Sequence, residues 1–405
     1  MNAAIERDDK LPALRPVEVT PLRTETGDLY VVLHDLSRIA PRPVAVSPAA
    51  YAILAHLDGE HSCADIQAAF LRAHGVLVPA ADVLDLVRAL DEALLLCGER
   101  YEAACAERRA AYLAAPARDN RDRYAEGAAL RREIEGLLAA GLPAPVPEVR
   151  GLIAPHLDYG RGRPCYADAY ATLARVPPAD RYVILGTNHA GLSSSIVATT
   201  KDFQTPLGRV STDRGFIARL EQALGVPLCR DELDHWAEHS VELQVHILQV
   251  LMDRRPFEIV PVLCPDVCGA TGTAPAAGDG PDLLDFADRL AALVAESGRR
   301  TTIIAAADLS HVGQRFGDPQ PTSADFLEAV ARSDRELLSL LESRRDAAFL
   351  DRLRETGNPT RVCSAGCICA LLRALPDRPC RVLAYHQATN RGAETHVTCA
   401  AAVIT

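Results

Sequence analysis

Residues 182–189 read Tyr182-Val183-Ile184-Leu185-Gly186-Thr187-Asn188-His189, a short apolar run that passes directly into polar residues and a histidine. Comparable runs occur at residues 151–154, 258–263, 301–306 and 381–385, with helical patterns between them. Apolar strands that alternate with helices are typical of a mainly parallel sheet covered on both faces. The sequence therefore predicts an α/β fold with a mainly parallel central sheet flanked by helices. In such sheets, ligand sites gather where strands end.

Polar residues follow three of the predicted strands at equivalent positions. His156 and His189 each follow one strand, and Asp308 and His311 follow another. A single histidine is usually solvated or held by a structural hydrogen bond, so none of these residues by itself indicates a functional site. Because neighbouring strand ends converge in space, their repetition predicts a shared site at one edge of the sheet.

The segment from His239 to His246 has helical spacing, and positions i, i+3 and i+7 place His239, Glu242 and His246 on one helix face. We interpret His239 and Glu242 as candidate catalytic residues near the strand ends. The pattern is neither the H-E-x-x-H motif of zinc proteases nor its inverted form, so a zinc site on this helix alone is not expected. The alternative is an amphipathic helix with a polar edge, which suits His246 better than the other two.

The chain has twelve cysteines. In a long chain without a secretion signal, cysteines are expected to stay reduced. Cys363, Cys367 and Cys369 form the densest group, and their spacing is one residue short of the C-x3-C-x2-C pattern of radical SAM enzymes. An iron–sulfur cluster at these positions is an alternative that the spacing disfavours.

The composition is that of a globular protein, with 48% hydrophobic and 24% charged residues. A net charge of -11 argues against a nucleic-acid partner, because binding to phosphates needs a basic face. Residues 1–10 are polar, and no stretch of about 18 apolar residues lacks a charge. We therefore expect no nucleic acid, no membrane segment and a cytoplasmic location.

Three regions follow one another along the chain. Residues 16–100 predict a small domain with a β-rich start and then helices, the first opening at Ser47-Pro48, an N-cap followed by a first-turn proline. Residues 101–148 are rich in alanine, arginine and glutamate and predict a helical linker. Residues 149–405 contain the alternating strands and helices, and with them the candidate site.

Short motifs in this last region resemble, in order and spacing, the signature segments of the Memo family. Its prokaryotic members are known as AmmeMemoRadiSam system protein B. The motifs are Pro155-His156, Gly186 to His189, Thr205 to Gly208, Glu238 to Ser240 with Glu242, Pro261 to Leu263, Asp308 to Phe316, and Cys363. The resemblance extends over residues 150–405.

The resemblance implies a fold related to the class III extradiol dioxygenases, which hold ferrous iron between two histidines and a carboxylate. In the Memo pattern a cysteine takes the place of the carboxylate, so the implied metal ligands are His156, His189 and Cys363. Two imidazoles and a thiolate suit Fe(II) or copper, and zinc also fits. The resemblance places Asp308 and His311 beside the metal, where we expect Asp308 to orient a ligating histidine and His311 to carry a proton.

The sequence also departs from the family pattern near these residues. Leu157 and Asp158 stand where the family usually has Ala-Gly, which puts a bulky group and a new carboxylate after the first histidine. Ala190 replaces a common second histidine, and Ser364 replaces a glycine after the cysteine. These departures leave the three implied ligands in place. They also mean that the resemblance does not identify the substrate of this protein.

Residues 16–100 resemble, in pattern and length, the PqqD-like winged-helix module that grips leader peptides, the alternative being a generic three-helix appendage. This resemblance suggests a peptide substrate bound by the N-terminal module, and the family context suggests a radical SAM protein and an AMMECR1-domain protein as partners.

The first functional hypothesis is a metal-dependent oxidoreductase. Two alternatives stay open: a non-catalytic protein that binds redox metal, and a zinc hydrolase with Asp308 or Glu242 as general base.

Overall fold

The computed structural model describes residues 9–24, 26–35, 37–189, 193–275 and 280–405. The chain divides into two compact units between Ala115 and Pro116. Within the described ranges, no helix is long and apolar enough to cross a membrane.

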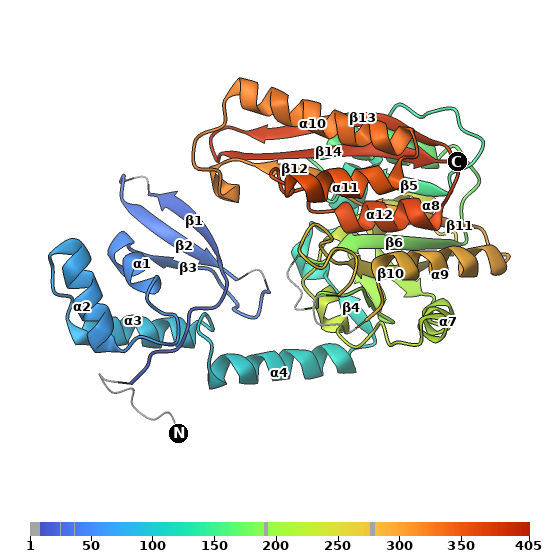
Figure 1. The fold of residues 1–405 in the computed structure, drawn as a ribbon. Coiled ribbons are helices and arrows are strands. Elements are labelled where there is room, and N and C mark those ends of the chain that lie inside the picture. The colour runs from blue at the N-terminus through green and yellow to red at the C-terminus, as the bar shows by residue number, and fades with distance from the viewer. Residues whose placement is uncertain (1–8, 25, 36, 190–192, 276–279) are drawn as a thin grey trace. The chain divides into compact units, whose positions relative to one another are not determined.

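The first unit contains a three-stranded antiparallel sheet followed by four helices (Figure 1). The strands are β1 (Glu18–Arg23), β2 (Leu29–His34) and β3 (Val44–Val46), and the helices are α1 (Pro48–Leu54), α2 (Cys63–His74), α3 (Ala80–Glu92) and α4 (Glu99–Ala114). Ser47 caps α1 by accepting a hydrogen bond from the amide of Ala50, and Ser62 forms a capping box with Asp65 in α2. The predicted β-rich start and following helices are confirmed, while the likeness to a PqqD-like module stays a prediction.

The hydrophobic core of the first unit joins its sheet to α1, α2 and α3. Among its buried residues are Leu33, Ile53, Ile66, Val87 and Leu90.

The segment predicted as one helical linker, residues 101–148, is divided between the two units. Helix α4 ends at Ala114, shortly before Pro116, which has no amide hydrogen to continue a helix. Then follow β4 (Ala117–Asp119), a 3-10 turn (Arg121–Arg123) and α5 (Gly127–Ala139). Strand β4 pairs in parallel with β8 (Asp202–Thr205), and α5 contacts α6 (Arg163–Leu173). Residues from 116 onward therefore fold with the second unit.

The second unit is built on one large mixed sheet whose centre is parallel. Its central strands lie in the order β5, β11, β6 and β10, and each neighbouring pair is parallel. Their bounds are Gly151–Ala154, Thr301–Ala306, Arg181–Thr187 and Glu258–Cys264. These four strands coincide with runs predicted from the sequence, so the mainly parallel centre of the sheet is confirmed.

Antiparallel strands extend the sheet beyond β5. Strand β14 (Thr395–Ile404) pairs with β5, with β13 (Cys380–Asn390) and with β12 (Asp308–Val312). The run at 381–385 thus belongs to an antiparallel hairpin rather than to the parallel centre. On the other side, β9 (Gly208–Thr212) lies between β10 and β8, and the short β7 (Val197–Ala198) pairs with β10.

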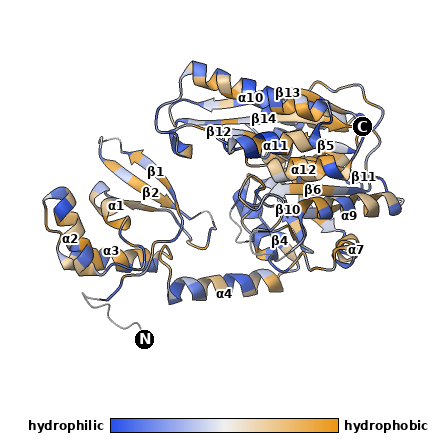
Figure 2. Ribbon diagram, viewed as in Figure 1, coloured by the Kyte–Doolittle hydropathy of each residue, from blue (hydrophilic) through white to orange (hydrophobic). Residues whose placement is uncertain are grey.

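Helices cover both faces of this sheet (Figure 1). Helices α5, α6 and α8 share one core with the sheet, and α7, α9, α10, α11 and α12 share the other. The bounds not yet given are α7 (Arg214–Leu224), α8 (Ser240–Met252), α9 (Leu283–Glu296), α10 (Ala324–Glu342), α11 (Asp346–Thr356) and α12 (Ala365–Ala374). Along β6, Val183 and Leu185 enter one core while Tyr182 and Ile184 enter the other, as the alternation of a strand requires. Figure 2 shows hydrophobic and hydrophilic residues alternating along α9 and α10, which is expected of helices with one buried face.

Two glycines let helix starts approach the carboxyl ends of the parallel strands. A Cβ atom at Gly186, near the end of β6, would lie 2.4 Å from Oγ of Ser240, the first residue of α8. A Cβ atom at Gly366, in the first turn of α12, would lie 2.3 Å from the carbonyl oxygen of Pro265, just after β10. Real Cβ atoms do not approach this closely, so both contacts depend on glycine. The starts of α8 and α12 therefore meet the strand ends at one edge of the sheet.

Candidate metal centre

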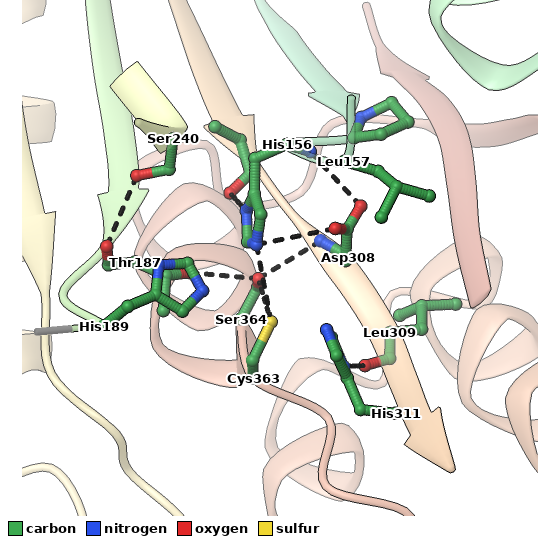
Figure 3. Close-up of polar contacts among 12 residues, drawn as sticks. His156, Leu157, Thr187, His189, Ser240, Asp308, Leu309, His311, Cys363 and Ser364 are labelled. Atoms are coloured by element: carbon green, nitrogen blue, oxygen red, sulfur yellow. Dashed lines mark hydrogen bonds and ion pairs between the residues drawn. The ribbon is translucent and has the colours of Figure 1, made fainter. Parts of the chain in front are cut away.

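His156 follows β5, and its ring is fixed by the neighbouring strand β11. The Nδ1 atom lies 2.9 Å from the carbonyl oxygen of Ala306, to which it donates a hydrogen bond. The other ring nitrogen, Nε2, then faces Sγ of Cys363 at 3.6 Å and Oδ2 of Asp308 at 3.5 Å (Figure 3). His156 is almost completely buried. Its Nε2 therefore points at the sulfur and the carboxylate from a rigid position.

His189 follows β6 and is held by Glu238, which immediately precedes His239. The Nδ1 atom of His189 lies 3.1 Å from each carboxylate oxygen of Glu238, and the backbone amide of His189 donates to the same carboxylate at 3.0 Å. Glu238 also accepts hydrogen bonds from the amides of His239 and Ser240, at 2.8 Å each. Glu238 stands beside His239 in one of the Memo-like motifs, but the sequence pattern alone assigns it no role.

His239 lies with His156 and His189 in one cluster. One nitrogen from each ring can be chosen so that all three atoms lie within 4.8 Å of one another. The ring centroids of His156 and His189 are 4.8 Å apart, and those of His189 and His239 are 5.1 Å apart and stacked. The structure thus places His239, predicted as catalytic, where it could also serve as a metal ligand.

Cys363 precedes α12 and reaches the same cluster (Figure 3). Besides its contact with His156, its sulfur lies 3.2 Å from Oγ of Ser364, the N-cap residue of α12. Burial acts against ionisation, but the charges of His156 and His311 and hydrogen bonds from His156 and His189 outweigh it and hold the pKa of the Cys363 thiol well below its usual range. Cys363 is therefore available as a thiolate, the form that binds metals.

Asp308 and His311 lie within β12, which begins just after β11, rather than in a loop that follows a strand. Oδ1 of Asp308 accepts a hydrogen bond from the backbone amide of His156 at 3.2 Å, and the amide of Asp308 donates to Ser364 at 3.1 Å. Nδ1 of His311 donates to the carbonyl oxygen of Leu309 at 3.1 Å. Figure 3 shows the Asp308 carboxylate beside His156 and the His311 ring on the side of Cys363.

The charges of the three clustered imidazoles differ. Burial disfavours the charged form of His156, but the Asp308 carboxylate and the Cys363 thiolate outweigh it and raise the pKa of His156 to about 9. Burial is also outweighed at His189, whose pKa the carboxylate of Glu238 holds well above the ordinary value. At His239, burial dominates and lowers the pKa to about 4. A metal cation bound here would take the place of the ring protons, so its binding would release protons.

Glu242 and His246 lie apart from this cluster, in a buried polar network. The carboxylate of Glu242 forms an ion pair with Arg118 and accepts hydrogen bonds from Asn120, at 2.6 Å, and from Tyr124. His246 packs edge-on against the Tyr124 ring, with centroids 4.5 Å apart. Both oxygens of Glu242 are therefore engaged, and the catalytic role predicted for it finds no support in its surroundings.

The departures from the family pattern have distinct environments. Leu157 joins a small apolar cluster with residues of β13 and β14. The carboxylate of Asp158 accepts hydrogen bonds from the backbone amide and the side chain of Arg161, in the turn before α6. Ser364 hydrogen-bonds Oγ1 of Thr187 at 3.0 Å and so joins α12 to the end of β6. Ala190 lies outside the described residues.

The two cysteines closest after Cys363 in the chain, Cys367 and Cys369, are buried in the hydrophobic core of the second unit. The sulfur of Cys367 lies 3.6 Å from Oγ1 of Thr187, and burial raises the pKa of the Cys369 thiol. Among the described residues, the group whose ligand atoms lie close enough to hold a metal ion is His156, His189 and His239, with Cys363 beside His156 but outside that group. The structure thus favours a single-ion centre over the iron–sulfur alternative.

The chain is similar to known proteins over most of its length. The family described as Memo-like protein matches residues 123–404. The chain is 31% identical to a MEMO1 family protein of Thermus thermophilus over 79% of this chain and 92% of that protein, and 25% identical to a MEMO1 family protein of Aquifex aeolicus over 83% and 84%. The crystal structure of an uncharacterized Escherichia coli K12 protein aligns with a TM-score of 0.33 and 15% identity, covering 63% of this chain and 100% of that one. The match over most of the chain shows that this protein belongs to the Memo-like family.

Proposed function

We propose that this protein is a metal-dependent oxidoreductase that binds Fe(II) or copper through His156, His189 and Cys363. The observation that carries the proposal is the orientation of the two imidazoles. In each ring, Nδ1 is engaged outside the cluster, by a main-chain carbonyl for His156 and by the Glu238 carboxylate for His189. Metal-ligating histidines are typically held in this way, with the second nitrogen left for the metal.

The donor set fits the proposed metals. Imidazole and thiolate ligands suit iron and copper, and three protein ligands leave room for a small molecule. His239 offers a further imidazole at the same place. A bound iron or copper ion would supply the redox chemistry that protein side chains lack.

Residues around the ligands supply positioning and proton transfer. The carboxylate of Asp308 fixes the backbone of His156 and faces its Nε2. Because Nδ1 of His311 is engaged by a main-chain carbonyl, its Nε2 is left to exchange a proton with a substrate. The side chains of His189 and His239 are 30% and 43% exposed, so a substrate would approach the centre from their side.

The same geometry argues against a cysteine nucleophile activated by a histidine. In a Cys-His-Asp triad, the thiol and the carboxylate bind opposite nitrogens of the imidazole. Here Cys363 and Asp308 both face Nε2 of His156, while Nδ1 is bound to the main chain. Convergence on one nitrogen is the arrangement expected around a cation.

Metal content tests the ligand assignment. Purified without oxygen, the wild type should carry about one iron or copper ion per chain, and Cys363→Ser should lose most of it. Cys367→Ser is the matched control, because this buried thiol lies in the first turn of α12 and contacts Thr187. Unchanged metal content in Cys363→Ser would refute the assignment, and equal loss in both variants would point to an iron–sulfur cluster.

Oxygen consumption separates catalysis from metal storage. An oxygen electrode should record uptake by the iron-loaded wild type with a suitable substrate mixture, and none by Cys363→Ser. Tight metal binding without uptake or product under any condition would favour the non-catalytic alternative.

We extend the proposal to partners on the strength of family membership and of the PqqD-like resemblance of residues 16–100. A radical SAM protein and an AMMECR1-domain protein are the proposed partners, and a peptide is the proposed substrate. Co-purification of the full chain with both proteins tests this. Failure of all three to associate, with or without a peptide, would contradict it.

A further inference from the structure

Arg118 is a buried cation near the start of the second unit. It is the middle residue of β4, and it precedes the residues that the family matches. Only 2% of Arg118 is exposed to solvent, and it is among the largest fully buried side chains of the protein. A guanidinium buried this deeply is costly unless its donors are satisfied, so its partners indicate what it holds.

The partners of Arg118 lie at the start of α8 and in the loop before it. Its Nε donates to the carbonyl oxygen of His235, its Nη2 donates to that of Glu238, and its Nη1 forms an ion pair with Glu242. The guanidinium carbon lies 5.2 Å from the ring centroid of Phe203, on β8. The planar fork of arginine thus hydrogen-bonds two main-chain carbonyls and pairs with one carboxylate.

The loop from His235 to Glu238 is the element that carries Glu238 to the cluster. Arg118 binds the main-chain carbonyls at both ends of this loop, while Nε2 of His235 lies 3.0 Å from the carbonyl oxygen of Val197. Arg118 therefore holds the main chain of Glu238. The carboxylate of Glu238 in turn holds His189 and the backbone of His239.

We propose that Arg118 is a positioning residue of the metal centre, acting through the loop 235–238 and the carboxylate of Glu238. The proposal rests on the metal-binding function proposed above. It makes the centre depend on a residue near the start of the second unit, ahead of the matched family region.

Arg118→Lys tests this proposal, with Arg181→Lys as a matched control. Lysine keeps the positive charge but cannot bind three acceptors in the fixed directions of a guanidinium. Arg181 is equally buried, pairs with Asp213 and lies 4.2 Å from the Phe216 ring centroid, but it is the first residue of β6, at the strand end opposite the cluster. Both substitutions should lower the unfolding temperature, so stability alone cannot account for a difference in metal binding.

The readouts are the Fe(II) dissociation constant, measured anaerobically by competition with a chelator, and the visible absorption of the Co(II)-loaded protein. Arg118→Lys should weaken Fe(II) binding by about tenfold and alter the Co(II) spectrum, since loss of a group that orients a ligand costs roughly 10–100-fold in affinity. Arg181→Lys should stay within about twofold of the wild type and keep its spectrum.

A wild-type dissociation constant and spectrum in folded Arg118→Lys would overturn the proposal and leave Arg118 a structural residue. If Arg118→Lys does not fold, the double variant Arg118→Gln/Glu242→Gln carries the test, because it removes the guanidinium together with its carboxylate partner and leaves no buried charge unpaired. It should also weaken Fe(II) binding by about tenfold, and an unchanged constant would overturn the proposal. If the wild type binds neither iron nor copper, the proposed function fails and this inference fails with it.

Discussion

Replacing Glu238 with glutamine should weaken both the fold and the metal centre, by amounts that can be worked from its contacts. One carboxylate oxygen accepts from the amides of His239 and Ser240, and the other accepts from the amide of His189. Either oxygen also lies within 3.1 Å of Nδ1 of His189. The side chain is 2% exposed, so water cannot replace a lost acceptor.

Glutamine has one oxygen, so at least one buried amide loses its acceptor and faces an amino group instead. The orientation of lower free energy keeps the glutamine oxygen on the two amides of His239 and Ser240. The amide of His189 is then left without an acceptor. An unpaired buried donor costs about 1–3 kcal/mol, and the lost charge-assisted bonds raise the total to about 2–5 kcal/mol. Because the His189 ring loses the carboxylate that orients it, metal affinity should fall by about 10–100-fold.

Urea unfolding and anaerobic chelator competition measure these two effects separately. Glu232→Gln is the control, since Glu232 is a buried carboxylate in the same stretch that accepts a hydrogen bond from Thr199 at 2.8 Å. This variant should lose stability but keep metal affinity within about twofold of the wild type. Wild-type metal affinity in a destabilised Glu238→Gln variant would refute the assignment of Glu238 as the residue that orients His189.

Three further predictions concern the fold around the centre and the first unit. Ser364→Ala should cost about 1–3 kcal/mol in urea unfolding, because the buried amide of Asp308 loses its acceptor; a wild-type free energy of unfolding would contradict this. Gly186→Ala should cost about 1–3 kcal/mol by overpacking against Ser240, and adding Ser240→Ala should recover part of the loss. The absence of any recovery would show that the contact is not the cause. Burial acts against the charged form of Asp35, but hydrogen bonds and an arginine outweigh it and hold its pKa below the ordinary 3.8. This stabilisation is therefore present above about pH 4 and lost as the pH falls through the folded pKa, so acid unfolding should be less steep in Asp35→Asn than in the wild type.

The centre of the sheet could be predicted because its strands are buried on both faces and read as continuous apolar runs. The runs at 151–154, 182–186, 258–263 and 301–306 all became central strands. Strand β14 was not predicted, since threonine and alanine residues give residues 395–404 a weak apolar signal although all of them are buried. Its long pairing, and not local preference, makes it a strand.

The linker prediction shows the limit of local periodicity. Residues 116–124 lie between two helices of similar composition, and the whole stretch was predicted as helical. The structure instead has a strand of three residues there, β4. Pairing with β8 and the burial of Arg118 decide that conformation, and both depend on residues far along the chain.

For the candidate site, the sequence by itself indicated that His156 and His189 would meet, because parallel strands bring their carboxyl ends to one edge. It also indicated the cysteine, through family resemblance. Only the tertiary structure decided how each ring is turned, that Glu238 rather than Glu242 serves the cluster, and that His239 stands with His156 and His189. The physical reason is that strand periodicity fixes where a residue lies along one element, whereas the direction of a ring nitrogen is set by hydrogen bonds to residues from other elements.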